Sequence, residues 1–373
     1  MQNTEKTGRT LIDGSRLMIE ALARAGADAF IGYPITPANL LYLYGSQRMD
    51  LMLSAPDEIT TLQWMAGLSA TGKLPVTATS FPGYALMLES VNMAYMMELP
   101  MVIILVQRLG PATGTATCGA QGDLLLLHGS ISGGHPMPVL ATSGFEDCWK
   151  LAAKAAEVAV RLRTPVVLLT SKEEVMTQKS FDTSLLETIE RVDRPWYSKT
   201  CCSYKSYKPG NLVPDFLPVI QKEHQVRLNA STHDQEGILQ HSTTEAMENT
   251  RRLEEKVINR MNEYIIYEHD IQAGADTLIV AYGITASAAR DAAASLRRKG
   301  KPTDLLVPAS LLPIPAEYLD ILGRYSKVVI AEENMNHQLA TLLYGQQIPK
   351  NIQLVNKLGK MISPEEIIKE VLP

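Results

Sequence analysis

The chain has 373 residues, of which 46% are hydrophobic and 20% are charged, and its formal net charge is −5. This length is enough for two domains with full hydrophobic cores. The negative net charge, without any basic stripe, argues against a nucleic-acid-binding surface. No apolar run approaches the roughly 20 residues that span a bilayer, and residues 1–6 lack the apolar region of a signal peptide. We therefore expect a cytoplasmic protein with neither a nucleic acid nor a membrane as partner.

The four cysteines are Cys118, Cys148, Cys201 and Cys202. None of them shows the C-x-x-C spacing that is typical of zinc and iron–sulfur sites, so we expect no metal site in this chain. The adjacent Cys201 and Cys202 are compatible with contact to a redox partner or with two free thiols in a loop. If the protein works with an iron–sulfur cluster, another chain must carry that cluster.

Between residues 15 and 170, helical patterns alternate with short aliphatic strands. A run such as 101–107, which is aliphatic throughout, is typical of a strand buried on both faces of a parallel sheet. The alternation predicts a parallel α/β sheet wound by right-handed crossovers. The expected helices are 15–25, 54–72, 84–98 and 145–162, and the expected strands are 28–32, 76–80, 101–107, 138–141 and 165–170.

Four polar residues follow strand ends or open helices in this region: Thr36, Glu58, Ser80 and Arg108. The carboxyl ends of parallel strands form the crevice where α/β proteins bind ligands, so we expect the four side chains at one edge of the sheet. Two of them also have purely structural explanations. Thr36 fits a strand-to-helix connector, and Glu58 fits the first turn of a helix capped by Ser54, where an acid complements the helix dipole.

The strand–helix alternation is lost at residues 179–267 and returns at residue 276. Residues 198–210 are polar with interleaved Tyr and Lys, which is typical of a solvated loop, and residues 244–267 have the pattern of a charged helix. We expect a first domain at 1–190, a connector at 191–270 that wraps it, and a second α/β domain at 271–373. No G-x-G-x-x-G motif occurs, so the sequence does not indicate a dinucleotide site. The P-loop motif and the G-x-S-x-G motif are also absent, so neither P-loop nucleotide chemistry nor a serine hydrolase is indicated.

The second domain should contain strands at 277–281, 303–307 and 327–332, a helix at 286–298, and a rigid proline turn at 312–315. Another helix should open near Gln338.

The turn at 33–37, Tyr-Pro-Ile-Thr-Pro, resembles the most specific motif of the alpha subunits of 2-oxoacid:ferredoxin oxidoreductases, of the 2-oxoglutarate or branched-chain type. Residues 57–58, 79–83, 106–108 and 110–114 follow in the order that this family shows, and the resemblance covers most of the chain. Residues 313–315 and 332–339 are similar to the family's second domain. The resemblance implies an α/β fold with a parallel-sheet domain that binds the pyrimidine of thiamine diphosphate. A transketolase C-terminal-like α/β domain would follow it.

The resemblance also implies an activity. Enzymes of this family use thiamine diphosphate to decarboxylate a 2-oxoacid oxidatively with coenzyme A, and they pass the electrons to ferredoxin. A partner beta subunit would supply the diphosphate–Mg²⁺ half of the cofactor site and an iron–sulfur cluster. Whether gamma or delta subunits also belong to the complex is left open. The chain would then be active only together with that partner.

Individual roles follow from positions that match the family's motifs. Glu58 would hydrogen-bond the pyrimidine N1′ and assist proton transfer there. Arg108 would meet the substrate carboxylate as a bidentate partner, and Thr36 would hydrogen-bond the carboxylate or the 2-oxo group. The residues expected to bind the cofactor are Tyr33, Pro34, Ile35, Glu58, Ser80, Phe81 and Pro82.

Two departures from the family pattern leave the substrate open. Phe81 stands where a small Gly is usual, and residues 115–123 lack the Lys or Arg often found there. Other functions remain as alternatives: a thiamine-dependent transferase, a non-oxidative decarboxylase, or a scaffold subunit without activity. A scaffold has no need for the Glu58 carboxylate, which argues against the last of these.

Overall fold

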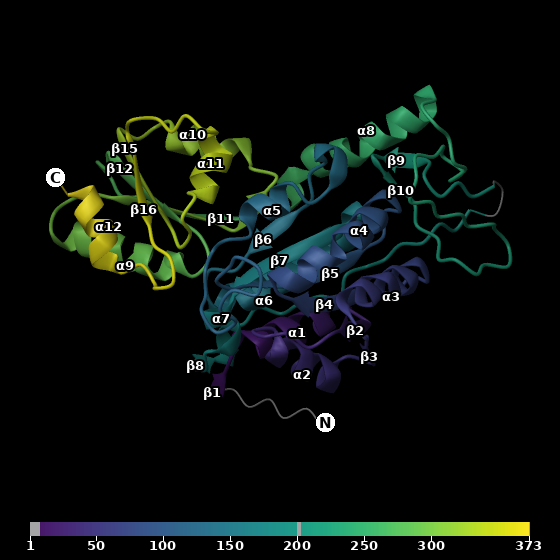
Figure 1. The fold of residues 1–373 in the computed structure, drawn as a ribbon, viewed down its shortest axis with the longest axis horizontal. Coiled ribbons are helices and arrows are strands. Elements are labelled where there is room, and N and C mark those ends of the chain that lie inside the picture. The colour runs from purple at the N-terminus through teal and green to yellow at the C-terminus, as the bar shows by residue number, and fades with distance from the viewer. Residues whose placement is uncertain (1–7, 200–202, 373) are drawn as a thin grey trace.

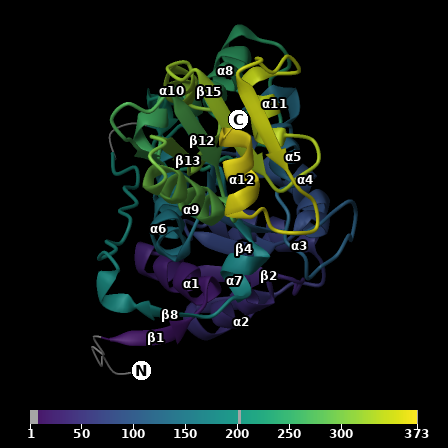
Figure 2. The ribbon, with the colours of Figure 1, turned by 90° about the vertical axis from the view of Figure 1, so that its left-hand side faces the viewer.

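The chain forms two α/β units that lie beside each other in the computed structural model (Figures 1 and 2). The structure describes residues 8–199 and 203–372, so Cys201 and Cys202 lie outside the described residues. Each unit is built on one largely parallel sheet, which confirms the predicted fold class. The N-terminal unit holds the larger sheet, and the C-terminal unit ends near the chain terminus marked in Figure 1.

The larger sheet has seven strands in the order β14-β6-β7-β5-β4-β2-β3. All neighbours are parallel except β14 and β6, as the right-handed alternation in the sequence predicts. The strand bounds are β2 (Ala29–Gly32), β3 (Leu51–Ser54), β4 (Pro75–Thr79), β5 (Met101–Gln107), β6 (Val139–Ala141), β7 (Pro165–Ser171) and β14 (Ser310–Leu312).

Helices cover both faces of this sheet because successive strand residues point to opposite sides. Ile103 and Leu105 of β5 pack in the core with α3 (Glu58–Ala70) and α4 (Phe81–Met96). Val102 and Ile104 pack on the other face in the core that contains α1 and α6. The remaining helices of this unit are α1 (Gly14–Ala25), α2 (Asn39–Arg48), α5 (Leu124–His128), α6 (Phe145–Leu162) and α7 (Lys172–Met176).

The second sheet has five strands in the order β11-β13-β12-β15-β16, and only β11 runs antiparallel to its neighbour. Its strands are β11 (Tyr267–Asp270), β12 (Thr277–Ala281), β13 (Asp304–Pro308), β15 (Lys327–Glu332) and β16 (Ile352–Asn356). The helices around it are α9 (Thr285–Arg298), α10 (Ala316–Leu322), α11 (Gln338–Tyr344) and α12 (Pro364–Val371).

Several boundaries differ from the sequence prediction, and α2 and β3 were not among the expected elements. Ser54 is not a helix cap, because it ends β3, paired with Gly32 of β2. The cap is Asp57, whose extended backbone lets its side chain accept from the Thr60 N–H at 2.7 Å, so α3 begins at Glu58. Helix α4 begins at Phe81, three residues before the predicted start, with a proline in its first turn.

The predicted helix at 244–267 is also too long. Helix α8 (Thr244–Ile258) ends at Asn259, and the chain then forms β11, whose Tyr267 pairs with Pro308 of β13. Pairing with a distant strand overrides the local helical pattern here. Similarly, Ser310 and Leu312, next to the predicted proline turn, form a strand paired with β6, so the C-terminal half completes the sheet of the N-terminal unit.

The segment 191–270 contains little regular structure besides α8, yet several of its side chains are buried. The predicted solvated loop at 198–210 is wrong for Tyr204 and Tyr207, which are both buried. The Tyr207 hydroxyl accepts from the Asn229 N–H at 2.9 Å, so the aromatic ring folds inward with its polar end satisfied. The short strands here are β9 (Pro209–Asn211) and β10 (Val213–Pro214), and β1 (Arg9–Ile12) pairs with β8 (Lys179–Asp182) elsewhere.

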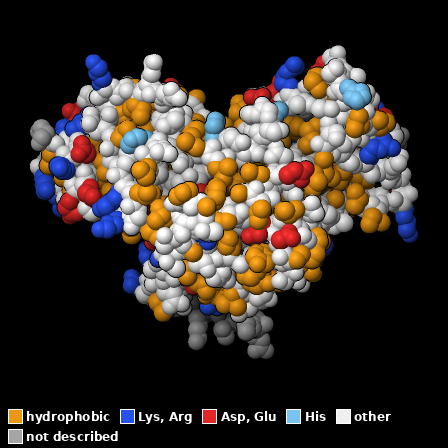
Figure 3. Space-filling model, viewed as in Figure 1, with side chains coloured by type: hydrophobic (Ala, Val, Ile, Leu, Met, Phe, Trp, Pro, Cys, Tyr) orange, Lys and Arg blue, Asp and Glu red, His pale blue; other side chains and the backbone are white. Residues whose placement is uncertain are grey.

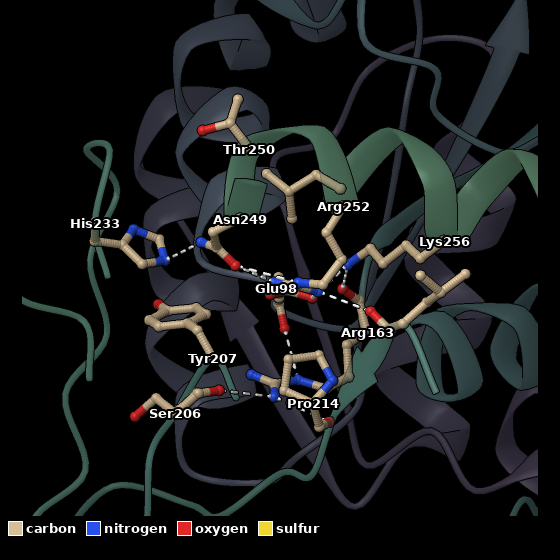
Figure 4. Close-up of polar contacts among 12 residues, drawn as sticks. Glu98, Arg163, Ser206, Tyr207, Pro214, His233, Asn249, Thr250, Arg252 and Lys256 are labelled. Carbon is tan, nitrogen blue, oxygen red and sulfur yellow. Dashed lines mark hydrogen bonds and ion pairs between the residues drawn. The ribbon is translucent and has the colours of Figure 1, made fainter. Parts of the chain in front are cut away.

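A buried ion network fastens α8 to the first unit (Figure 4). Glu98, just after α4, is fully buried and accepts from Lys256 at 2.7 Å and from both terminal nitrogens of Arg252. Burial opposes the charge of Glu98, but the Lys256 and Arg252 cations outweigh it and hold the pKa of this carboxyl well below its usual range. Burial lowers the pKa of Lys256 to about 8 although Glu98 raises it.

Candidate functional site

The four residues singled out from the sequence follow four neighbouring strands. Thr36 lies in the turn after β2, Glu58 opens α3 after β3, Ser80 follows β4, and Arg108 follows β5. The order β5-β4-β2-β3 in the sheet is continuous and parallel. The structure therefore brings all four to the carboxyl edge of one sheet, which is where α/β proteins bind ligands.

Arg108 and Thr36 are in direct contact across the edge. The Arg108 Nη1 donates to the Thr36 carbonyl oxygen at 2.5 Å, and the Thr36 hydroxyl accepts from Asn39 Nδ2 at 3.0 Å. Arg108 is only 6% exposed, and its Nε has no acceptor among the described residues. The Arg108 Nη1 thus holds the turn that contains Thr36, while the Nε of the guanidinium is available to bind a ligand.

Glu58 is buried, at 6% exposed, and its carboxylate makes no hydrogen bond or ion pair with any residue in the described ranges. It lies against the first turn of α4. A Cβ on Gly83 would stand 2.6 Å from Glu58 Oε1 and 2.1 Å from Thr79 Oγ1, so only glycine fits at this position. The carboxylate is therefore available to accept a hydrogen bond from a bound ligand.

Further buried polar atoms on β4 and β5, or just after β4, lack partners within the described parts of the chain. They are the Thr77 hydroxyl of β4, the Ser80 hydroxyl after it, and the side-chain oxygen of Gln107 at the end of β5. Native proteins leave few such groups unsatisfied, and each calls for an explanation. Ser80 and Gln107 stand at the carboxyl ends of β4 and β5 and so support a polar ligand site at this edge, whereas Thr77 lies in the middle of β4. The sequence drew attention to Ser80 but not to Thr77 or Gln107, which look like ordinary strand residues.

Asp123 is a site residue that the sequence prediction did not include. It is 4% exposed at the start of α5, and its Oδ2 has no donor in the described ranges. Burial raises the pKa of Asp123 to about 7, and the nearby Arg108 opposes that shift. Burial in turn lowers the pKa of Arg108, against the effect of Asp123. No local signal could have marked Asp123, since its burial depends on the second unit.

The loop that carries Asp123 is held by the second unit. Gln121 Nε2 donates to the Tyr282 carbonyl at 2.7 Å, while its Oε1 accepts from the Thr285 hydroxyl at 2.7 Å and from the Glu333 N–H at 2.8 Å. Gly283, at a positive φ of 59°, allows Gln121 to approach, because a Cβ there would lie 2.9 Å from Nε2. The edge of the first sheet is thus closed on one side by the second unit.

The other residues expected to bind a cofactor lie along the same edge. Tyr33 is 41% exposed and Pro34 is exposed, whereas Ile35, Phe81 and Pro82 are half-buried. Phe81 and Pro82 form the first turn of α4, next to Gly83. These uncharged side chains lie along the same sheet edge as the buried residues Glu58, Ser80 and Arg108.

A cavity of about 400 Å³ lies at the opposite, amino-terminal edge of the sheet. Its arginines already serve the fold. Arg194 donates to Asp28 at 2.7 Å and to the Gly26 carbonyl, and Arg163 donates to the Pro214 and Asp215 carbonyls. These bonds clamp the segment 191–270 onto the sheet, so we place the candidate site at the carboxyl edge.

Within residues 8–199 and 203–372, no group of three or more His, Cys, Asp or Glu side chains is arranged to hold a metal ion. Nor does that part of the chain contain a helix with the length and apolar character needed to cross a membrane.

A parallel α/β unit with polar side chains at its carboxyl edge has the arrangement in which α/β enzymes bind cofactors. Residues 20–256 match the family model described as "Pyruvate flavodoxin/ferredoxin oxidoreductase, thiamine diP-bdg", and residues 275–367 match "Pyruvate:ferredoxin oxidoreductase core domain II". The chain therefore belongs to the pyruvate flavodoxin/ferredoxin oxidoreductase family of thiamine-diphosphate-dependent enzymes, which confirms the resemblance noted in the sequence.

Relatives of two substrate types are similar over nearly the whole chain. The 2-oxoglutarate synthase subunit KorA of Methanocaldococcus jannaschii is 28% identical over 97% of this chain and 98% of its own length. The ketoisovalerate oxidoreductase subunit VorB of Methanothermobacter thermautotrophicus is 27% identical over 97% and 96%. The solved 2-oxoglutarate:ferredoxin oxidoreductase of Magnetococcus marinus, with 2-oxoglutarate, coenzyme A and succinyl-CoA bound, matches with a TM-score of 0.88 and 25% identity. That match covers 100% of this chain and 66% of the solved one.

Proposed function

We propose that the chain is the alpha subunit of a cytoplasmic 2-oxoacid:ferredoxin oxidoreductase and supplies the pyrimidine side of the thiamine diphosphate site. The complex would convert a 2-oxoacid and coenzyme A to an acyl-CoA and pass the electrons to ferredoxin. The observation that carries this proposal is the Glu58 side chain, which is 6% exposed at the start of α3 and lies at the same sheet edge as the buried Arg108.

The residues at the edge fit the aminopyrimidine half of the cofactor. Glu58 would hold a proton at the ring N1′, and Gly83 leaves room for the carboxylate beside the start of α4. Ser80 offers an unsatisfied hydroxyl at the end of β4, and Tyr33 to Ile35 with Phe81 and Pro82 would border the ring. When bound, thiamine diphosphate supplies the reactive thiazolium carbon for cleaving the bond between the carboxylate and the 2-oxo carbon.

Arg108 would bind the substrate carboxylate. Its Nη1 is engaged with the Thr36 carbonyl, but its other nitrogens make no hydrogen bond with described residues, so they can pair with an anion. The same bond fixes the direction of the guanidinium plane. Thr36 would add a hydrogen bond from its hydroxyl, which now accepts from Asn39.

A partner beta subunit would complete the site. This chain offers no metal-holding cluster within the described residues, so we assign the diphosphate, Mg²⁺ and the iron–sulfur clusters to partner subunits. Figure 3 shows hydrophobic side chains gathered over the face formed by α3, α4 and α5. Ile59, Trp64, Leu86 and Leu125 are each at least 36% exposed there, and such a surface is typical of a subunit interface.

The substrate class is a 2-oxoacid, and both 2-oxoglutarate and a branched-chain 2-oxoacid stand as candidates. Because residues 115–123 contain no Lys or Arg, any cation that meets a second carboxylate must come from elsewhere in the complex.

The test is co-purification of the chain with its partner subunits, followed by a panel of 2-oxoacids with coenzyme A and a viologen acceptor. We expect coenzyme A-dependent viologen reduction by the complex and none by the chain alone. Turnover by the isolated chain would contradict the shared site. Loss of 2-oxoacid without reduction of the acceptor would identify a non-oxidative decarboxylase instead.

A further inference from the structure

A row of hydrogen bonds runs from Glu98 through helix α8 to His233 (Figure 4). Arg252 donates to both carboxylate oxygens of Glu98, and it also donates to Asn249 Oδ1 through Nε at 3.2 Å and through Nη2 at 2.6 Å. On the far side of Asn249, its Nδ2 lies 3.0 Å from His233 Nε2, and His233 Nδ1 lies 2.6 Å from the Ser231 carbonyl oxygen. The side chains of Glu98, Arg252, Asn249 and His233 are each at most 5% exposed.

The partners fix the direction of every bond in this row. A guanidinium has donors only, so the Asn249 atom that faces Arg252 must be the amide oxygen, and its NH₂ group must face His233. A carbonyl oxygen only accepts, so His233 Nδ1 carries the proton towards Ser231 and Nε2 accepts from Asn249. His233 is therefore held as the neutral imidazole in a single tautomer.

A second proton on His233 has no acceptor among the described residues. It would lie on Nε2, opposite the Asn249 Nδ2, so that two donors would face each other. Turning the amide of Asn249 would place its NH₂ group against Arg252 and so only move the conflict. His233 is 0% exposed, so water cannot accept the hydrogen bond either, and an unsatisfied buried cation is costly.

His233 lies in a compact turn formed by residues 229–240, which we call the 229–240 turn. His233 and Leu239 form an antiparallel bridge within it. The turn is bound to the connector through Tyr207, whose hydroxyl accepts from the Asn229 N–H at 2.9 Å and whose N–H donates to the Gln235 carbonyl at 3.0 Å. The Tyr207 ring also packs on His233, with the ring centroids 3.9 Å apart. The bond between His233 and Asn249 is the buried polar link from this turn to α8.

We propose that His233 is an acid-sensitive latch, which binds the 229–240 turn to α8 while the imidazole is neutral and releases it when the imidazole is protonated. The residues of the latch lie apart from the candidate site, so this inference does not depend on the proposed function.

The groups that face His233 act in both directions. Burial is the largest effect on the pKa of His233 and lowers it, and the Arg252 cation acts in the same sense. Lys256 donates to Glu98 at 2.7 Å and adds a second cation to the group. Four groups favour the charged imidazole, namely the Ser231 carbonyl, the carboxylates of Glu98 and Asp234, and the face of the Tyr207 ring. Burial prevails, and the pKa of His233 lies below its ordinary value of 6.5.

Linkage gives the range of pH in which the latch acts. Because the pKa of His233 is lower in the closed latch than in the released turn, the latch is fully closed above the ordinary pKa of 6.5. It weakens as the pH falls from that value through the lower folded pKa. The equilibrium constant for release should rise by up to about tenfold per pH unit in this interval.

The experiment is hydrogen–deuterium exchange of the 373-residue chain at about pH 7.5 and at about pH 5.5. It is read as protection factors, which correct for the intrinsic pH dependence of amide exchange. In wild type, protection of peptides within the 229–240 turn should fall by up to about tenfold at the lower pH. Peptides from β5 should keep their protection, because the latch is local.

Two variants of the latch should abolish this acid sensitivity. Asn249→Asp places a carboxylate oxygen opposite His233 Nε2 and still accepts from Arg252, so the charged imidazole gains an acceptor and the turn should stay protected at about pH 5.5. His233→Gln cannot be charged, so its protection should be the same at both pH values. His241→Gln is the matched control, because His241 is an exposed histidine just after the turn, and it should behave as wild type.

Several outcomes would overturn the latch. Wild-type protection of the turn that is equal at the two pH values would exclude it. Asn249→Asp or His233→Gln losing protection in parallel with wild type would show that another group is titrating. An equal loss of protection in β5 would mean that acid unfolds the whole unit rather than releasing the turn.

Discussion

Replacing Glu58 with glutamine separates its catalytic explanation from its structural one. The residue opens α3 and is buried at 6% exposed. As a first-turn acid it gains roughly 0.3–1 kcal/mol from the helix dipole. Glutamine keeps the size of the side chain and loses only that interaction. We expect the unfolding free energy of Glu58→Gln to stay within about 1 kcal/mol of wild type.

The proposed role predicts a much larger effect on the chemistry. Positioned acid–base groups typically contribute about 10²–10⁴-fold in rate, which corresponds to roughly 3–5.5 kcal/mol of barrier. An amide cannot hold the proton at N1′ as a carboxylate does. Glu58→Gln should therefore change the activation free energy by several kcal/mol more than it changes the unfolding free energy. One measurement of each is enough to resolve this difference.

The assay is deuterium exchange at the C2–H of thiamine diphosphate in the reconstituted complex, with urea unfolding measured in parallel. Glu146→Gln is the control, because Glu146 is an exposed acid in the first turn of α6. Exchange in Glu58→Gln should slow by about two to four orders of magnitude, and Glu146→Gln should match wild type. If Glu58→Gln exchanges as fast as wild type, Glu58 is only a helix-start acid.

Arg108→Lys should raise the KM for the 2-oxoacid about ten- to a hundredfold and leave the KM for coenzyme A nearly unchanged. The reason is that lysine keeps the positive charge but loses the planar guanidinium fork. Unchanged 2-oxoacid kinetics in the complex would exclude a contact between Arg108 and the substrate carboxylate. Glu98→Gln should destabilise the chain by about 3–5 kcal/mol in urea unfolding, since it leaves the buried cations Arg252 and Lys256 unpaired. Glu20 is partly exposed, so the control Glu20→Gln should cost no more than about 1 kcal/mol. The fold depresses the pKa of Glu98, so its contribution to the free energy of unfolding is fully present above the ordinary pKa of 4.5 and is lost as the pH falls through the lower folded pKa. If Glu98→Gln lost stability in acid to the same extent as wild type, Glu98 would be excluded as the source of that loss. We also propose the division into 1–190, 191–270 and 271–373, for which limited proteolysis should cut first in the largely exposed run 238–245; first cuts inside 66–108 would contradict it.

The sequence alone determined much of the first unit. Continuous aliphatic strands and amphipathic helices follow from local patterning, and β5, α6, β12 and β15 have the bounds that the pattern predicted. Thr36 and Arg108 follow strands that the alternation predicted, whereas β3, which precedes Glu58, was not among the expected strands and Ser80 was expected inside one. Parallel strands share one carboxyl edge, so order along the chain was enough to bring these residues together.

Only the tertiary structure decided the features that depend on distant pairing. Ser310–Leu312 joins the first sheet, and Tyr267–Asp270 forms a strand directly after the region predicted as helix, because each finds a partner far along the chain. Asp123 is ordinary in sequence, and its burial requires Gln121 to be fixed by the second unit. Contacts between distant segments set the local dielectric and the available partners, and these determine whether a carboxyl group is a solvated surface charge or a proton-binding group in a site.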